Sequence, residues 1–210
     1  VAPYANLGEV KLRITARAKN ELEARNIIKP VKEELQKEFS KFIFGENDDN
    51  LQSILIKELL KRKESLVFAE SCTGGLLSSS ITSIAGSSQV FKGSIISYSN
   101  ELKQSLLNVP EDLIKKYGAV SEEVAEAMAT NAKEKLKSDW SIAISGIAGP
   151  SGGSKEKPVG LVYIAIAGPN DHITKIKKIF NSAKNRIEIQ TLSVNVCLNS
   201  LRLILLSDSK

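Results

Sequence analysis

Residues 66–81, LVFAESCTGGLLSSSI, contain in one continuous run a strand, a turn and the start of a helix. The first four residues are apolar, as is typical of a short buried strand. Polar residues and a Gly pair follow, and Leu77, Ile81 and Ile84 then recur at helical spacing. A strand that leads through a glycine-containing turn into a helix is the unit from which α/β proteins are built, so this run predicts that fold class.

The chain on either side of this run continues the alternation. Ser99 and Ser121 stand where the N-caps of two helices are expected. The other predicted elements are helices over 50–63 and 100–107 and after residue 121, strands over 94–98 and 140–145, hairpin strands over 160–167 and 173–180, and a closing helix over 183–206. This order predicts a three-layer α/β/α domain whose sheet is mixed because it contains the hairpin.

A small α+β region precedes this domain. Residues 10–18 alternate apolar and polar side chains, which predicts a half-buried strand with one basic face. Asn20 is placed to cap an amphipathic helix, which Pro30 is expected to kink or split. A short strand over 42–44 and an acidic loop follow. We therefore predict two domains, 1–48 and 49–210.

The composition excludes several classes of protein. The chain has 210 residues, 42% of them hydrophobic, and no apolar run of about 18 residues that would cross a membrane. Cys72 and Cys197 form neither a disulfide framework nor a CxxC pair, and with His172 they cannot fill a four-ligand zinc site. We expect a soluble, cytoplasmic protein. Because Met128 is the only Met, the chain is expected to be a fragment or a processed product of a longer protein.

Three polar clusters follow the predicted parallel strands, at residues 71–75, 98–103 and 145–153. Ligands of α/β proteins bind at the carboxyl ends of such strands, so we expect the clusters to meet at one edge of the sheet. Ser71 is a candidate nucleophile, and the amides near Thr73, Gly74 and Gly75 would point toward the oxygen of the group that it attacks. The alternative is that the Gly pair only permits close packing and that Ser71 caps the helix.

A nucleophilic serine needs a base, and the sequence offers a single imidazole. His172 lies in a polar turn of the predicted hairpin, where a solvated surface role is expected, so a Ser-His-Asp triad is not predicted. The other candidate is Lys103, because a position near a helix start and partial burial would lower its pKa; the alternative is a surface lysine. Tyr98 could relay a proton. Cys72 competes with Ser71 as nucleophile, or is simply a small buried side chain.

Five short motifs, in this order, resemble the C-terminal domain of the CinA family. They are AESCTGG (69–75), YSNELK (98–103), YGAVSEEVA (117–125), SGIAGP (145–150) and KPVG (157–160). Each motif is weak by itself, whereas all five together over residues 65–180 are specific. The family hydrolyses the amide of nicotinamide mononucleotide. The resemblance therefore implies a nicotinamide-nucleotide amidase that releases nicotinate mononucleotide and ammonia with no metal or other cofactor.

The resemblance also implies roles for individual residues. Ser71 matches the nucleophile, Lys103 the base and Tyr98 the assisting hydroxyl. Thr73, Gly74 and Gly75 match the turn that binds the developing oxyanion. The other expected substrate-binding residues are Asn100, Ser145, Gly146, Gly149 and Arg186. Ser145 replaces the Thr more usual in the family, and residues 180–186 lack the Gly usual before the family's arginine, so a solvated helix arginine is the alternative for Arg186.

Residues 1–48 resemble the small KH-type domain that precedes this domain in longer CinA proteins. A further nucleotide-processing domain, with pyrophosphatase activity in the family, is expected to lie outside this chain. KH domains grip nucleic acid through a GxxG loop, whereas residues 1–48 contain only Gly8 and Gly45 and balance 9 Lys and Arg with 8 Asp and Glu. We expect a structural or dimerisation element, no nucleic-acid partner and, from the resemblance, a homodimer.

Two other functions stay open. The first is a non-catalytic nucleotide-binding or competence and recombination accessory module, which the family's association with competence suggests. The second is an amidase of the same mechanism that acts on another small carboxamide. Ser71, Lys103 and Tyr98 favour an enzyme, because a binding module has no need of all three together.

Overall fold

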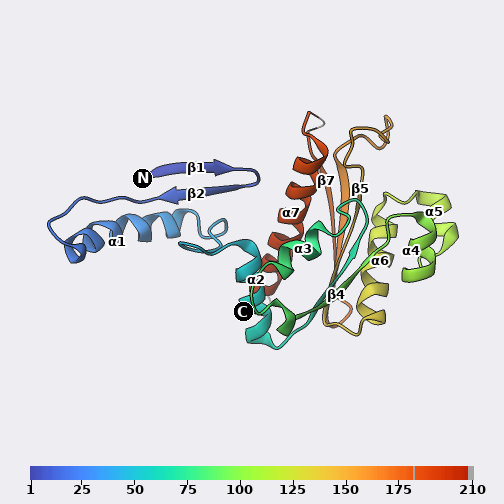
Figure 1. The fold of residues 1–210 in the computed structure, drawn as a ribbon, viewed down its shortest axis with the longest axis horizontal. Coiled ribbons are helices and arrows are strands. Elements are labelled where there is room, and N and C mark those ends of the chain that lie inside the picture. Colours follow the sequence, from blue (N-terminus) through green and yellow to red (C-terminus); the bar gives the residue numbers. More distant parts are fainter. Residues whose placement is uncertain (182, 208–210) are drawn as a thin grey trace. The chain divides into compact units, whose positions relative to one another are not determined.

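A computed structural model describes residues 1–181 and 183–207 of the protein (Figure 1). Two parts of the predictions fall outside the described residues. One is Ser182, which belongs to the segment 180–186 that contains Arg186, and the other is the last three residues of the predicted second domain. The chain divides into two compact units, one over Val1–Asn50 and the other from Leu51 onward. We describe each unit by itself.

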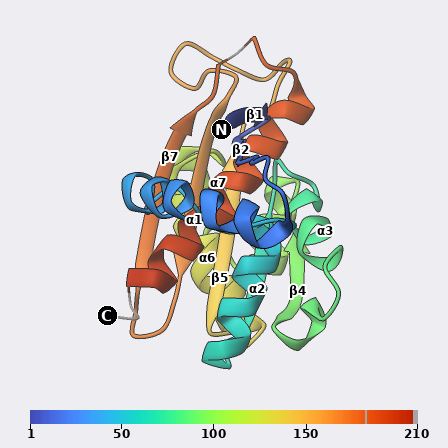
Figure 2. The same cartoon turned by 90° about the vertical axis from the view of Figure 1, so that its left-hand side faces the viewer.

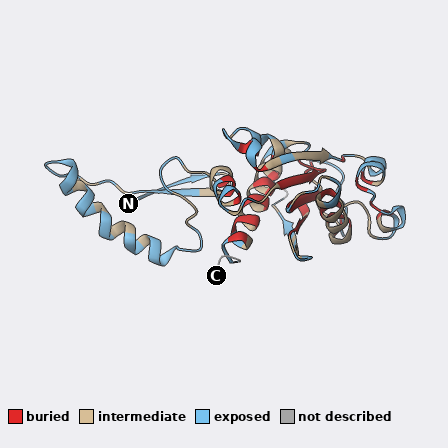
Figure 3. Ribbon diagram, turned by 90° about the horizontal axis from the view of Figure 1, so that it is seen from below, coloured by how far each residue is buried: buried red, intermediate tan, exposed pale blue. Residues whose placement is uncertain are grey.

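The first unit consists of a hairpin and a helix. Strands β1 (Ala2–Asn6) and β2 (Glu9–Arg13) pair antiparallel across a turn in which Gly8 has a φ of 83°. Helix α1 (Glu21–Glu38) is capped by Asn20, whose side chain accepts a hydrogen bond from the Glu23 amide at 2.9 Å. None of these elements contains a buried residue, and Figure 3 shows this part of the ribbon in the colours of exposed and intermediate residues.

Three predictions for this unit need correction. The strand predicted over 10–18 is β2, which ends at Arg13, and its partner β1 was not predicted because its five residues are all exposed and show no alternation. Pro30 does not split α1, which continues as one helix on both sides of it. Residues 42–44 form no strand, because the amides of Phe42 and Ile43 donate to the Phe39 carbonyl within a turn.

The second unit is built on a five-stranded mixed sheet in the order β4-β3-β5-β6-β7. Strands β3 (Leu66–Glu70), β4 (Phe91–Ile96) and β5 (Trp140–Gly146) are parallel. Strands β6 (Leu161–Ala167) and β7 (Ile173–Ile179) form the predicted hairpin and continue the sheet antiparallel. The predicted mixed α/β sheet is thereby confirmed.

Helices cover both faces of this sheet. Helix α6 (Glu122–Lys135) packs on one face, with α4 (Asn100–Leu107) and α5 (Glu111–Tyr117) outside it. Helices α2 (Leu51–Arg62), α3 (Leu76–Thr82) and α7 (Arg186–Ser207) lie on the other face, and Figure 2 shows α2 and α7 in front of the sheet with α6 behind it. A short 3₁₀ helix, Ser87–Gln89, leads into β4. The resulting three layers agree with the predicted architecture.

The core lies between these layers. Every residue of β3 is buried, and so are Ile142, Ala143 and Ile144 of β5 next to it. Continuous apolar runs are expected where both faces of a parallel sheet are covered. Helix α7 is long and apolar enough to cross a membrane by length and composition, but eight of its residues are buried in the domain, which is also the pattern of a core helix in a soluble protein.

Element boundaries differ from prediction in three places. Strand β4 begins and ends earlier than the predicted 94–98, so Tyr98 lies in the loop after it. Helix α7 begins at Arg186 and not at residue 183, because Asn185 and Glu188 cap it there by exchanging side-chain to backbone hydrogen bonds of 3.0 and 2.8 Å. Helix α5 was not predicted.

Candidate active site

The strand register aligns the three polar clusters at the carboxyl edge of β3, β4 and β5. Glu70 at the end of β3 lies opposite Ile96 of β4 and Ile144 of β5. The residues that follow extend the pairing, since the Ser71 amide donates to the Ile144 carbonyl at 3.0 Å and the Ser97 amide to the Glu70 carbonyl at 2.8 Å. The clusters converge as the topology predicted.

A pocket of about 250 Å³ opens at this edge. Its lining combines the candidate nucleophile and base with segments from β5, the loop after β5 and the first turn of α7. The lining residues are Ser71, Cys72, Tyr98, Asn100, Lys103, Ala119, Val120, Ser145, Gly146, Ile147, Ala148, Gly149, Ser151, Gly152 and Arg186. None of them is acidic, whereas Lys103 and Arg186 are basic. The guanidinium of Arg186 therefore favours a ligand with negative charge.

Ser71 and Lys103 form a buried pair at the bottom of this site. The Lys103 Nζ lies 3.0 Å from the Ser71 Oγ, and the two side chains come from segments 32 positions apart. The same nitrogen donates to the Ser97 carbonyl at 2.8 Å and to the Tyr98 carbonyl at 3.4 Å. An uncharged amine held by two carbonyl acceptors turns its lone pair to the third neighbour. That neighbour is the Ser71 hydroxyl, so the geometry suits proton transfer from Ser71 to Lys103.

Burial disfavours the charged form of this lysine. Lys103 is only 1% exposed, and within the described residues no carboxylate lies within ion-pairing distance of its Nζ. Loss of hydration disfavours the ammonium and lowers the pKa of Lys103, an effect that Cys72 and Glu101 partly oppose. The predicted helix start also holds, because α4 begins at Asn100 with Ser99 as its N-cap.

Cys72 lies beside this pair, and burial shifts the pKa of its thiol upward, whereas burial shifts the pKa of Lys103 downward. Desolvation by burial raises the pKa of its thiol to about 12, although Arg186 and Lys103 act in the opposite direction. A thiol with that pKa stays protonated at neutral pH, and only the thiolate is strongly nucleophilic. Of the two candidate nucleophiles, Ser71 is therefore the one with a base in contact.

The turn after Ser71 is organised by Glu70, whose carboxylate is completely buried. Its Oε2 accepts hydrogen bonds from the Thr73 hydroxyl at 2.7 Å, the Gly75 amide at 3.0 Å and the Leu77 amide at 3.1 Å. Its Oε1 accepts from the Ser78 amide at 2.9 Å and also from the Ser78 hydroxyl. A carboxylate thus occupies the start of helix α3, where the unpaired amides of a helix attract negative charge.

This arrangement limits the expected role of the turn at Thr73, Gly74 and Gly75 in binding the oxyanion, because three of its donors already have acceptors. The Thr73 hydroxyl and the Gly75 amide already donate to Glu70, and the Gly74 amide donates to the Ser71 carbonyl at 3.1 Å. None of these three residues lines the pocket. These three donors hold the turn in shape instead of pointing at a ligand. The backbone amide of Thr73 is not among them.

Tyr98 and Arg186 meet at the mouth of the pocket. The Tyr98 hydroxyl accepts a hydrogen bond from Arg186 Nη2 at 2.8 Å, and Arg186 Nη1 donates to the Gly149 carbonyl at 2.8 Å. Tyr98 is 58% exposed, and its hydroxyl contacts neither Ser71 nor Lys103 within the described residues. Arg186 is therefore placed at the site, while the assisting role expected of Tyr98 would need its hydroxyl to turn away from Arg186.

The other expected substrate-binding residues also lie at the pocket. Asn100 is exposed at the start of α4. Ser145 is buried, and its hydroxyl donates to the Ala119 carbonyl at 2.7 Å, which leaves only its lone pairs for a ligand. A side chain at Gly146 would come within 2.8 Å of the Leu161 carbonyl, so the loop after β5 can stay close to β6 only with Gly at this position.

Sequence reasoning missed three side chains that shape this site. Glu70 was passed over as the end of an apolar run. Gln190 donates from its Nε2 to the Cys72 carbonyl at 2.7 Å, and its position one helical turn after Arg186 was the available signal. Lys157 donates from its Nζ to the Val120 carbonyl at 2.8 Å and to the Tyr117 carbonyl at 2.5 Å, which ties the pocket wall to the KPVG motif.

The single histidine lies far from this site along the fold. His172 stands next to β7, where its Nε2 lies 2.9 Å from the Thr174 hydroxyl and its ring packs edge-on against Trp140, with centroids 5.7 Å apart. Trp140 begins β5 and so belongs to the opposite edge of the sheet. Within the described residues, no group of three or more His, Cys, Asp or Glu side chains could hold a metal ion.

Comparison with known proteins assigns both units to the same family. Residues 48–205 match the CinA C-terminal domain, and residues 1–45 match the damage-inducible protein CinA KH domain. The chain belongs to the CinA family. The resemblance inferred from the five motifs is thereby confirmed, as is the KH-type identity of the first unit.

Relatives in sequence agree with the assignment to the CinA family. A CinA-like protein of Prochlorococcus marinus strain AS9601 is 78% identical over the whole chain, and one of strain NATL2A is 50% identical over 97% of it. The chain spans about half the length of the curated relatives it matches, 50% and 47% for these two.

The solved structures that match are of competence/damage-inducible proteins. That of CihA from Agrobacterium tumefaciens has a TM-score of 0.72 and 34% identity over 78% of this chain and 98% of that one. A CinA superfamily protein from Escherichia coli has a TM-score of 0.69 and 30% identity over 79% of this chain and 98% of its own.

Proposed function

We propose that this chain hydrolyses the carboxamide of nicotinamide mononucleotide to nicotinate mononucleotide and ammonia, with Ser71 as nucleophile and Lys103 as base. The observation that carries the proposal is the 3.0 Å contact between Ser71 Oγ and the Nζ of a lysine that is 1% exposed and has no carboxylate partner within the described residues. A surface lysine or a structural ion pair would not need such burial. Membership in the CinA family supports the choice of substrate.

The reaction proceeds in two halves. Lys103 Nζ accepts the Ser71 proton while Oγ bonds to the amide carbon, and the tetrahedral intermediate carries one negative oxygen. As the intermediate collapses, the carbon–nitrogen bond breaks, Lys103 returns the proton to the leaving nitrogen, and ammonia departs. Water then attacks the acyl ester with Lys103 as base again, which releases the carboxylate product and restores the Ser71 hydroxyl.

The charge around the pocket supports an anionic nucleotide as substrate. Arg186 belongs both to this pocket and to a wider, open hollow of about 590 Å³ that Lys184, Pro150 and Val159 also line. A carboxamide placed against Ser71 would leave a ribose phosphate directed toward this hollow. There the guanidinium of Arg186 and the ammonium of Lys184 would compensate the phosphate charge, with Glu188 at the same hollow limiting how many anionic groups are accepted.

The test is the release of ammonia and nicotinate mononucleotide from nicotinamide mononucleotide, followed side by side for the unaltered chain and Ser71→Ala. Turnover by the unaltered chain alone is the expected result. The uncharged riboside, which lacks the phosphate, should be a much poorer substrate. Turnover of other carboxamides but not of the nucleotide would move the proposal to another substrate. No turnover of any carboxamide would contradict it in favour of a nucleotide-binding or competence accessory module.

We further propose that the protein acts in the cytoplasm as a homodimer and that its first unit serves assembly and not nucleic-acid binding. The support is the family membership, together with the near balance of 9 basic and 8 acidic side chains over residues 1–48. Light scattering after size exclusion should give twice the chain mass. A monomer, or tight binding of RNA by the chain at physiological salt, would contradict this proposal.

A further inference from the structure

Glu70 is a buried carboxylate directly beside the candidate nucleophile. It is 0% exposed, it precedes Ser71 in the chain, and it ends the central strand β3. A buried carboxylate is costly unless several donors compensate its charge, and here five donors do so, three of them backbone amides. All five belong to residues 73–78, the segment that leads from Ser71 into α3.

The hydrogen bonds of this segment leave two amides without an acceptor. The Ser71 amide donates to Ile144, and the Gly74 amide closes a turn by donating to the Ser71 carbonyl. The amides of Gly75, Leu77 and Ser78 donate to Glu70. Within the described residues the amides of Cys72 and Thr73 donate to no other residue. They belong to the two central residues of the turn that the Gly74 amide closes.

The first of these two amides belongs to a residue at the pocket, and the second follows it directly in the turn. Cys72 lines the pocket together with Ser71. In serine hydrolases that place the nucleophile on a sharp turn after a strand, the amide of the following residue is a donor to the oxyanion. Amides already bonded to a carboxylate cannot serve this purpose without giving up that bond.

We propose that Glu70 is a positioning residue, which holds the segment 73–78 so that the amides of Cys72 and Thr73, and not those of Gly74 and Gly75, receive the oxyanion formed by attack of Ser71. This inference rests on the proposed serine nucleophile but not on the identity of the substrate. In this proposal the role of the Glu70 charge is to fix the geometry of the turn. Glu70 itself touches neither substrate nor transferred proton.

The variant Glu70→Gln tests this inference, because glutamine keeps the size of the side chain and exchanges one acceptor oxygen for a donor. Its amide nitrogen would face donors on whichever side it is placed, so part of the segment must shift. Misplacement of reacting groups by about 1 Å costs on the order of 100-fold in rate. The matched control is Glu111→Gln, which removes a carboxylate that is 60% exposed and pairs with Lys115 on the surface.

Two readouts are measured for each protein well below its melting midpoint. The first is the rate at which a small fluorophosphonate modifies Ser71, in which the oxygen–phosphorus bond forms, fluoride leaves and the Ser71 proton passes to Lys103. The second is kcat and KM for nicotinamide mononucleotide. We expect Glu70→Gln to lower the modification rate and kcat about 100-fold with KM within about threefold, because the lost interaction acts on the transition state. Glu111→Gln should match the unaltered chain in both readouts.

A folded Glu70→Gln protein that reacts at the original rate would overturn the inference, even if its melting midpoint falls, because Glu70 would then only stabilise the fold. If Glu70→Gln does not fold, Thr73→Val decides, since it deletes a single 2.7 Å bond to Glu70. It should lower the modification rate about tenfold at constant KM, and an unchanged rate would again overturn the inference. Modification of Ser71 without nucleotide hydrolysis would reject the proposed substrate alone. Absence of both reactions in the unaltered chain would reject the proposed function and this inference together.

Discussion

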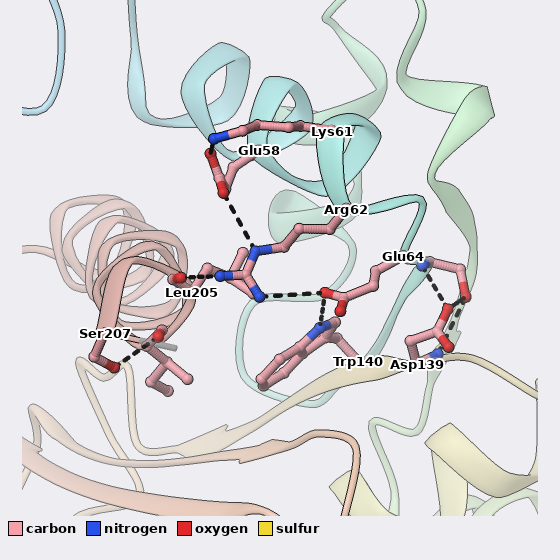
Figure 4. A network of polar contacts seen from close by, with 10 residues as sticks. Glu58, Lys61, Arg62, Glu64, Asp139, Trp140, Leu205 and Ser207 are labelled. Atoms are coloured by element: carbon pink, nitrogen blue, oxygen red, sulfur yellow. Dashed lines mark hydrogen bonds and ion pairs between the residues drawn. The ribbon is translucent and has the colours of Figure 1, made fainter. Parts of the chain in front are cut away.

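Each of the two edges of the sheet contains a cation shielded from solvent, half-buried at one edge and buried at the other, and the two cations have opposite surroundings. At the amino edge Arg62 meets Glu58 at 3.2 Å, lies 4.0 Å from Glu64 and donates to the Leu205 carbonyl, while Glu64 also accepts from the Trp140 indole at 2.7 Å (Figure 4). At the carboxyl edge Lys103 is more deeply buried, and among the residues that the structure describes its Nζ has hydrogen bonds only to a hydroxyl and to carbonyls. The first cation is compensated by acids, and the second is not.

Because of this difference, we expect the cation at the amino edge to contribute to the stability of the fold and the cation at the carboxyl edge to contribute to the proposed reaction. A compensated cation keeps its charge and links elements, here α2, α7 and β5. An uncompensated one can give up its proton, which makes it useful as a base and costly for the fold. The comparison therefore predicts that substitutions at one edge change activity and those at the other change stability.

Removal of the uncompensated cation should have the largest effect. In Lys103→Met the turnover should fall at least about 1,000-fold because the base is lost. The free energy of unfolding should rise by about 1 kcal/mol because a desolvated amine is replaced by an apolar chain. Ammonia release and urea unfolding measure the two quantities, with Lys115→Met as an exposed lysine control. Lower stability together with full activity would reverse the comparison.

Removal of the compensated cation should act on stability alone. Arg62→Met leaves Glu64 without this cation and leaves Glu58 with only the more distant Lys61, at 3.9 Å, at the amino edge, where the arginine side chain is 17% exposed. We expect the free energy of unfolding to fall by about 2 kcal/mol. Ser71 modification at a temperature where the variant is folded should keep its original rate. A slower rate in the folded variant would show that the two edges are coupled.

The pH dependence sharpens the comparison further. Because burial lowers the pKa of Lys103 below its ordinary 10.5, turnover should rise with pH through that lowered pKa and then level off. At a pH between the pKa of Lys103 in the folded chain and its pKa in the unfolded chain, the Lys103 side chain is protonated mainly in the unfolded chain. The stability of the unaltered chain should therefore rise with pH in this window. The free energy of unfolding of the unaltered chain should be lower than that of Lys103→Met, and this difference should shrink over the same window and vanish above about pH 10.5. Urea unfolding of both proteins across pH measures this, and a difference that does not change with pH would contradict it.

Cys72 should give the smallest effect at the carboxyl edge. Its thiol, with a pKa raised to about 12, stays protonated at neutral pH and is 5% exposed. Cys72→Ala should keep most of the turnover and lose about 1 kcal/mol of stability. Iodoacetamide should leave the folded chain unmodified at pH 7.5, as judged by mass. Inactivation by this reagent would promote Cys72 over Ser71.

The predicted candidates and the observed site agree best where the sequence pattern is local. The caps at Ser99 and Ser121 and the run over 66–75 are specified by neighbouring residues, and the structure confirms these caps, the strand and the turn. Strand β1 and the uninterrupted helix through Pro30 were missed or predicted wrongly, because the first unit buries no side chain in its helix or strands and so leaves no periodic signal. The roles of the catalytic candidates stay predictions that the experiments above test.

The sequence alone determined the type of chemistry available. A single His in a predicted hairpin turn argued against an imidazole base, and five ordered motifs indicated the family together with Ser71 and Lys103 as candidates. Only the tertiary structure decided that these two side chains lie 3.0 Å apart, that burial keeps the Cys72 thiol protonated at neutral pH, and that the Gly75 amide expected to bind the oxyanion already donates to Glu70. The physical reason is that residue types follow from the chain itself, whereas burial and hydrogen-bond partners depend on strand register and on side chains brought in from distant segments.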